Sequence, residues 1–140
     1  MKVHTRSDLE TLRAEGLSTL YPPRLRISVG MATCGRAAGA TDVYDALREE
    51  ADARGLDLML VATGCIGYCQ QEPLVDVALP GRGRVLYARV TPDRARDLIA
   101  VLASGELLAE GALAVIPPTP SHSPNIGGGE SFPPSSPPRL

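Results

Sequence analysis

Three cysteines are the residues of this 140-residue chain whose type and spacing could do chemistry. Cys65 and Cys69 stand four positions apart in the segment TGCIGYCQQEPLV, and Cys34 lies in MATCGRAAGA. Glycines such as Gly64 and Gly67 predict irregular turns, which leave room for backbone N–H groups to approach the sulfides of an iron–sulfur cluster. Such cysteines are typical ligands of an iron–sulfur cluster, which normally takes four. The alternative is that all three pack as small apolar side chains.

Other cysteine chemistries fit this spacing less well. A redox-active dithiol centre normally has two residues between its cysteines, whereas three stand between Cys65 and Cys69. Structural zinc takes a second close pair of cysteines or histidines, and a catalytic cysteine needs a histidine base. The two histidines, His4 and His122, are remote from the cysteines in the sequence. The segment 35–39 (GRAAG) lacks the full glycine pattern and the lysine of a phosphate-binding loop.

Composition indicates one domain with an aliphatic core. Hydrophobic residues make up 44% of the chain, yet there is no Trp and one Phe. The 14 basic and 16 acidic residues are interspersed, which does not indicate a nucleic-acid surface. No apolar run approaches the roughly 18 residues of a membrane span, and the start of the chain is charged. An odd number of cysteines without an export signal favours a reducing compartment, so we expect a cytoplasmic location.

The first half of the chain predicts helix, strand, helix and strand. Ser7 and Glu10 have capping-box spacing, which predicts a short helix from Ser7 that ends near Gly16. Leu25, Ile27 and Val29 alternate with polar residues and predict a strand with one buried face. Cys34 is expected in the loop that follows this strand. A helix capped by Thr41 and ended by Gly55 comes next, and the apolar run 56–63 predicts a strand buried on both faces.

The second half predicts two strands and a helix. The β-rich runs 73–79 and 84–90 are joined by a Pro-Gly-Arg-Gly turn, as in a hairpin. Thr91 and Pro92 open a helix that ends at Gly105. The order β-α-β followed by β-β-α predicts an α/β thioredoxin-like sandwich with a small mixed four-stranded sheet. Because both cysteine segments follow strands, we expect Cys34, Cys65 and Cys69 to converge at one end of the sheet.

The chain divides into four parts on composition. The ranges are an N-terminal helix and linker (1–24), the domain (25–107), a connecting segment (108–116) and a tail (117–140). The tail is rich in Pro, Ser and Gly and is expected to be disordered. It is interpreted either as a product of a shifted or truncated reading frame, or as a genuine linker or proline-rich recognition segment.

Three segments together carry a resemblance to a known family. VGMATCGRAAGA, TGCIGYCQQEPLV and LYARVTPDRARDLI resemble the thioredoxin-like 2Fe-2S ferredoxins. They are most similar to the version fused to the N-terminus of the flavin-bearing, NADH-binding subunit of NADH dehydrogenases and NAD-linked hydrogenases. The resemblance covers about Leu25 to Gly105. It also implies a cis peptide before Pro73, where thioredoxin-like folds commonly have one.

The resemblance implies a ligand set with one position missing. Cys34 falls on the second ligand of the family's 2Fe-2S cluster, and Cys65 and Cys69 fall on the third and fourth. The first ligand has no cysteine here, because Val29 stands five positions before Cys34, and Ser28 is the nearest candidate for an oxygen ligand. Three outcomes stay open: a cluster with Ser28 as fourth ligand, a cluster completed by a partner protein, or a cluster-free domain.

Two functions of different classes follow from the resemblance. The first is an electron-transfer module of an NADH-dependent oxidoreductase complex, which carries electrons but catalyses no reaction alone. The second is a cluster-free docking or assembly domain of such a complex. In either case the expected partners are the flavin- and NADH-binding subunit or module and other iron–sulfur subunits, with the chain as a peripheral subunit where the complex is membrane-associated. We expect no nucleic-acid partner, no membrane insertion, and no flavin or NAD bound by this chain.

Overall fold

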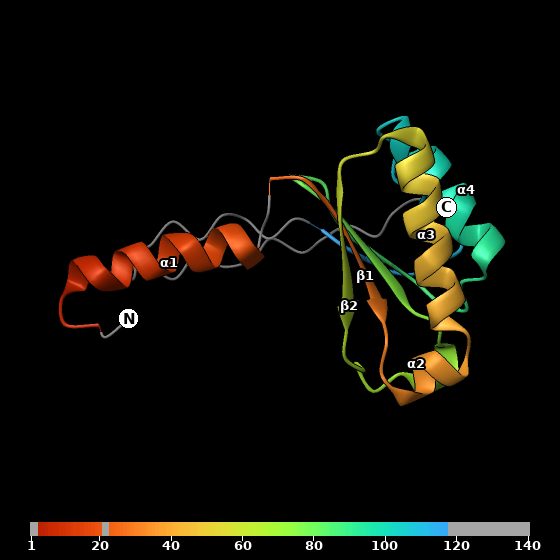
Figure 1. Cartoon of the computed structure of the whole chain (residues 1–140), viewed down its shortest axis with the longest axis horizontal. Helices are drawn as coiled ribbons and strands as arrows, with labels where there is room; N and C mark the ends of the chain where they lie inside the picture. The colour runs from red at the N-terminus through yellow and green to blue at the C-terminus, as the bar shows by residue number, and fades with distance from the viewer. Residues whose placement is uncertain (1–2, 21–22, 118–140) are drawn as a thin grey trace, which may run out of the picture.

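A five-stranded mixed sheet forms the centre of the chain, and the computed structural model describes residues 3–20 and 23–117 (Figure 1). The predicted α/β class is therefore confirmed. The predicted tail lies outside the described residues apart from Pro117. The elements in chain order are α1 (Arg6–Leu20), β1 (Leu25–Gly30), α2 (Thr33–Ala37), α3 (Ala40–Arg54), β2 (Leu58–Thr63), η1 (Cys69–Gln71), β3 (Val75–Leu79), β4 (Gly83–Tyr87), α4 (Pro92–Ala103) and β5 (Ala112–Ile116).

The order of the strands in the sheet is β2-β1-β3-β4-β5. β1 pairs in parallel with β2, and all the other neighbours are antiparallel. Because β1 and β2 are parallel, their carboxyl ends lie at one edge of the sheet, where Gly30 is opposite Thr63. The two cysteine segments both begin at this edge, as the sequence predicted from the strands that precede them.

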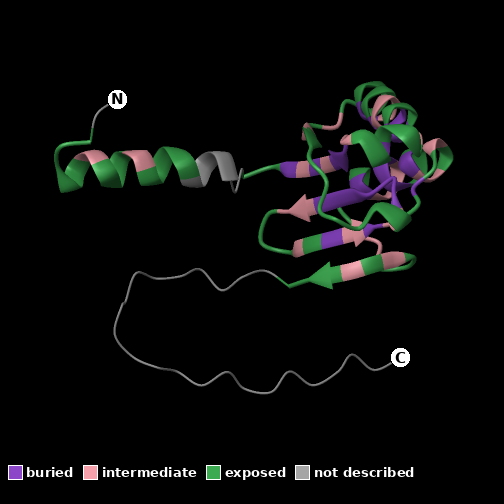
Figure 2. Cartoon of the chain, turned by 90° about the horizontal axis from the view of Figure 1, so that it is seen from below, coloured by how far each residue is buried: buried purple, intermediate pink, exposed green. Residues whose placement is uncertain are grey.

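Alternation along β1 decides which face of the sheet is buried. Ile27 and Val29 are fully buried, whereas Arg26 and Ser28, which alternate with them, lie on the other face and are half-buried. α3 and α4 cover the first face (Figure 1), and Figure 2 shows the buried residues gathered between these helices and the sheet. The second face holds a groove of about 480 Å³ that crosses β2, β1, β3 and β4 and reaches Ile116 of β5.

The fifth strand corrects the predicted four-stranded sheet. β5 lies within 108–116, which was expected to be a connecting segment, and it pairs antiparallel with β4. Its sequence, ALAVI, is short and has alanine at alternate positions, so it carries little strand signal. It lies at the edge of the sheet, where Val115 is 59% exposed. The other edge strand, β2, is half-buried and not buried on both faces as predicted, because only one side of it is paired.

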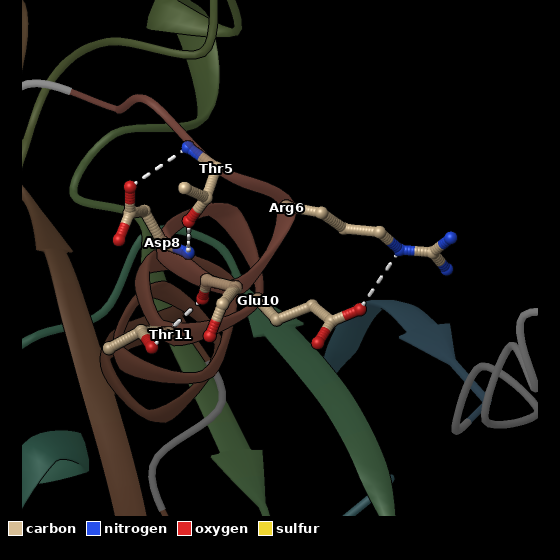
Figure 3. Close-up of polar contacts among 6 residues, drawn as sticks. Thr5, Arg6, Asp8, Glu10 and Thr11 are labelled. Atoms are coloured by element: carbon tan, nitrogen blue, oxygen red, sulfur yellow. Dashed lines mark hydrogen bonds and ion pairs between the residues drawn. The ribbon is translucent and has the colours of Figure 1, made fainter.

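The first helix begins two residues earlier than the predicted capping box. Asp8 N–H donates to Thr5 Oγ1 at 3.2 Å, and Thr5 N–H donates to Asp8 Oδ2 at 2.9 Å (Figure 3). This reciprocal pair has the same three-residue spacing as Ser7 and Glu10, and Glu10 instead pairs with Arg6 at 3.2 Å. Donation from the His4 and Thr5 N–H groups lowers the pKa of Asp8. α1 also continues past the predicted end, to Leu20.

Two later helices begin and end mostly as predicted. Thr91 caps α4 by accepting from Arg94 N–H at 3.3 Å. α3 ends at Gly55, whose φ of 61° is in the left-handed region. Its beginning differs from the prediction, because Gly39 with φ 94° is the cap and Thr41 lies inside the first turn. No helix within 3–20 or 23–117 has both the length and the apolar composition needed to cross a membrane.

Tyr87 joins β4 to the segment that leads into β5. Its ring is buried, and its hydroxyl donates to the Leu108 carbonyl. Burial raises the pKa of Tyr87 above its ordinary value of 10.0, and Arg94 opposes this shift. The ionised side chain is therefore disfavoured in the folded domain, so the neutral hydroxyl contributes stability that is complete below pH 10.0 and is lost as the pH rises above it.

We expect Tyr87→Phe to lower the free energy of unfolding by about 1 kcal/mol at neutral pH, because the Leu108 carbonyl loses its donor. Urea unfolding of both proteins at neutral pH and at stepwise higher pH measures the effect. The gap between wild type and variant should shrink as the pH passes the ordinary tyrosine pKa. A gap that stays constant through this range would contradict the role given to the hydroxyl.

Candidate metal centre

The candidate site is at the edge of the sheet where β1 and β2 end. Met31 N–H, just after β1, donates to Thr63 O at the end of β2 over 2.9 Å. Gly30 N–H donates to Leu74 O at 3.0 Å, which joins the same edge to the start of β3. Three segments that are far apart in the sequence are thus fixed to one another. They carry Cys34 after β1, and Cys65 and Cys69 after β2.

Cys34 is carried by the short helix α2, not by the predicted loop. Its side chain is exposed at the beginning of the helix, whereas the next residue, Gly35, is buried against β1. The Arg36 side chain donates to Met31 O at 3.0 Å and fastens the helix to the end of the strand. Close backbone packing at Gly35 and this bond from Arg36 together determine where Cys34 lies.

Cys65 and Cys69 lie together in the exposed turn after β2. Their sulfur atoms are 3.5 Å apart, and Gly67 N–H donates to Cys65 Sγ at 3.2 Å. Gly67 has φ 87°, a left-handed backbone conformation that glycine adopts readily and other residues rarely do. The turn that directs this N–H at sulfur therefore depends on a glycine at position 67. This turn therefore directs a backbone N–H group at a cysteine sulfur. The approach of N–H groups to the sulfides of a cluster stays a prediction.

The sulfur pair has a separation close to that of two thiolates on one metal atom. Two ligands about 2.3 Å from a tetrahedral metal are about 3.8 Å apart, which is near the observed 3.5 Å. Cys34 does not complete a three-ligand group: within the described residues, no three His, Cys, Asp or Glu side chains are close enough to hold one ion. The donor type and the N–H group fit an iron–sulfur cluster at Cys65 and Cys69, and the inclusion of Cys34 stays a prediction.

Ser28, the candidate for an oxygen ligand, lies within β1 and not in a loop. It is opposite Val61 in β2 and Asp76 in β3, and it lines the groove on the uncovered face of the sheet. A serine there is two positions before the end of the strand, while Cys34 is in the helix beyond it. Its role as a ligand stays a prediction.

Residues 69–74 lead from the cysteine turn back into the sheet at β3. The turn η1 leads to a cis peptide between Glu72 and Pro73, which confirms the predicted isomer. Arg89 N–H donates to Gln71 O at 2.8 Å, and Val90 N–H donates to Pro73 O at 3.1 Å. The segment after the cysteine turn is therefore held by the residues that follow β4 as well as by β1.

Glu72 is a residue of the site that sequence reasoning missed. It is 7% exposed, although residues 62–70 before it are all exposed. Its Oε2 accepts from Leu74 N–H at 2.8 Å. The one feature of the sequence that could have pointed to Glu72 is its place next to an apolar run. This feature does not show whether the glutamate side chain is buried or exposed.

No protein-family model matches the chain. Among proteins of assigned name, it is 36% identical over 74 residues to the NADP-reducing hydrogenase subunit HndB of Solidesulfovibrio fructosivorans. The match covers 52% of this chain and 59% of the relative. The chain thus matches about three fifths of the length of that relative.

The fold is shared with solved structures of a thioredoxin-like [2Fe-2S] ferredoxin from Aquifex aeolicus. One superposes with a TM-score of 0.57 at 19% identity, over 66% of this chain and 92% of the ferredoxin. A second, of the wild-type ferredoxin, gives a TM-score of 0.55 at 18% identity, over 65% and 97% of the two chains. The predicted thioredoxin-like fold is confirmed by these neighbours.

Proposed function

We propose that this chain is an electron-transfer module that binds a [2Fe-2S] cluster through Cys34, Cys65 and Cys69. The observation that carries the proposal is the exposed pair of sulfur atoms 3.5 Å apart, with Gly67 N–H directed at one of them. A bound cluster supplies a carrier for one electron at a time, and hydrogen bonds to its sulfur ligands tune its potential. The role of the three cysteines is to hold it at an exposed edge, where a partner can approach.

The partners we propose are the other subunits of an oxidoreductase linked to a nicotinamide cofactor. The relative named as a subunit of an NADP-reducing hydrogenase supports an assembly of this general kind. Within it, the chain would exchange electrons with a flavin- and NADH-binding subunit or module and with other iron–sulfur subunits. Such an assembly would be cytoplasmic. The fourth ligand would be Ser28 or a residue of a partner.

One observation favours a second candidate function. The part of the chain that the structure describes holds no group of three His, Cys, Asp or Glu side chains around one metal ion. A domain that keeps the fold but no cluster would act as a docking or assembly element of the same complex. The two candidates differ in whether iron binds to the isolated chain.

Anaerobic reconstitution of the purified chain with iron and sulfide decides between these candidates. We expect a brown protein with about two irons per chain and a paramagnetic reduced state, because the three thiolates can hold the cluster. Cys65→Ser and Cys69→Ser should each lose most of the bound iron, since each removes one sulfur of the close pair. Ser28→Ala should retain it if a partner supplies the fourth ligand, and lose it if Ser28 is that ligand.

Matched controls separate loss of a ligand from loss of the fold. Each variant should keep the melting temperature of the metal-free wild-type chain, because all three cysteine side chains are exposed. A wild-type chain that stays colourless after anaerobic reconstitution would overturn the proposal that these three cysteines hold a cluster in the isolated chain, and would favour the docking domain.

A further inference from the structure

Glu72 has a buried carboxylate whose position needs a physical reason. Carboxylates are rarely this far removed from water unless they are paired, and each unsatisfied buried oxygen carries a desolvation cost. Oε2 accepts from Leu74 N–H, but Oε1 is buried without a hydrogen-bond partner among the described residues. A side chain retained at such a cost is expected to perform a task that a smaller or apolar residue would not.

The carboxylate occupies the space beneath two glycines of the cysteine site. A Cβ atom added to Gly30 would be 2.9 Å from Glu72 Oε2 and 3.0 Å from Oε1. A Cβ atom added to Gly35, the neighbour of Cys34, would be 3.3 Å from Oε2. The carboxylate is therefore packed against the end of β1 and the beginning of α2 at the same time.

Glu72 is also attached to the other cysteine segment. Its N–H donates to Cys69 O at 3.4 Å, and its carboxylate holds Leu74 N–H at the entry to β3. One residue thus touches the helix that carries Cys34 and the turn that ends with Cys69. Among the described residues, no other buried charged side chain lies at this edge, since Asp76 is farther along β3 and is paired with Arg84.

We propose that Glu72 is a positioning residue of the cysteine site, whose carboxylate is the spacer that fixes α2 relative to the segment after Cys69. Size and an acceptor oxygen are what the spacer requires. Glutamine has both, because it has the same length and one amide oxygen that can accept from Leu74 N–H. Alanine has neither, so it leaves a space beneath Gly30 and Gly35 into which α2 can shift. The inference rests on the proposed function only in taking these cysteines as the site.

Hydrogen exchange of the metal-free, full-length chain tests the spacer. The reporters are Arg36 N–H and Ala38 N–H, which donate within α2 to Ala32 O and Cys34 O. In Glu72→Ala we expect these two amides to exchange at least about tenfold faster than in wild type, while the amides of α3 do not change. In Glu72→Gln they should exchange at the wild-type rate, and the exposed variant Glu49→Ala serves as a matched control.

The glycine above the carboxylate provides a reciprocal test. Gly30→Ala places a methyl group against Glu72 and should accelerate the same two α2 amides, whereas Gly30→Ala combined with Glu72→Ala should restore slow exchange because the methyl group then fills the space. If Glu72→Ala fails to fold, the comparison of Gly30→Ala with Glu72→Gln gives the same test.

Three results would overturn the proposal. The first is wild-type exchange of the two α2 amides in Glu72→Ala, and the second is wild-type exchange of these amides in the single variant Gly30→Ala. The third is faster exchange of these amides in Glu72→Gln. None of these measurements needs a metal. A chain that binds no iron can therefore still confirm the spacer, and one that binds iron can still contradict it.

Discussion

Gly35→Ala is expected to destabilise the domain by about 3 kcal/mol or more, at the upper end of the cost of overpacking. A Cβ atom at this position would lie 2.1 Å from Gly30 O, far inside van der Waals contact. The obstacle is a backbone carbonyl and cannot rotate away as a side chain can. Relief requires α2 to move off the end of β1, and the movement takes Cys34 with it.

Urea unfolding followed by far-UV circular dichroism measures this loss. Gly64→Ala is the matched control in the same site, because a Cβ atom at Gly64 meets nothing within 4 Å. It should change the free energy of unfolding by less than about 0.5 kcal/mol. Equal stability of Gly35→Ala and wild type would mean that α2 does not pack on β1 as closely as described.

Ile27→Ala is expected to lower the free energy of unfolding by about 2–5 kcal/mol, the range for large-to-small changes in a core. Ile27 is 0% exposed and lies in β1, which has paired strands on both sides, and α3 packs on the same face. Removal of its side chain leaves a cavity that the sheet cannot easily close, because hydrogen bonds to β2 and β3 hold the strand in place.

The measurement is again urea unfolding at neutral pH, with Val115→Ala as control. Val115 is 59% exposed in the edge strand β5, so little transfer free energy is lost there and the change should stay near 0.5 kcal/mol. A loss at Ile27 no larger than at Val115 would show that the buried face of β1 is not the core of the domain.

Local signals in the sequence were sufficient for the elements near the core. Leu25, Ile27 and Val29 alternate because one face of β1 is covered by helices, and such alternation can be recognised without a structure. Thr91 followed by Pro92 is an equally local signal for the beginning of a helix, and it is confirmed. The cis peptide at Pro73 was predicted from family resemblance and not from the residues around it.

Features that depend on tertiary context could not be predicted in the same way. β5 has too little sequence signal of its own and exists as a strand because β4 offers a free edge. Thr5 and Ser7 both begin segments with capping-box spacing, and spacing alone does not choose between them. The sequence around Gly35 does not show why this residue has to be a glycine. The reason is the Gly30 carbonyl, five residues earlier in the chain, which leaves no space for a side chain.

The direction of β5 determines how the cysteines, which follow the carboxyl ends of β1 and β2, are oriented in any larger assembly. β5 runs antiparallel to β4, β4 to β3, and β3 to β1, so β5 ends at the edge where β1 begins. α1 precedes the start of β1, so α1 and the end of β5 both join the sheet at the end opposite the cysteine turn, which follows β2. A module joined through α1 or after β5 would be attached at the end of the sheet opposite the cysteines, so the attachment would leave the sulfur pair exposed. The length of the connection would set the effective concentration of the sulfur pair near its partner.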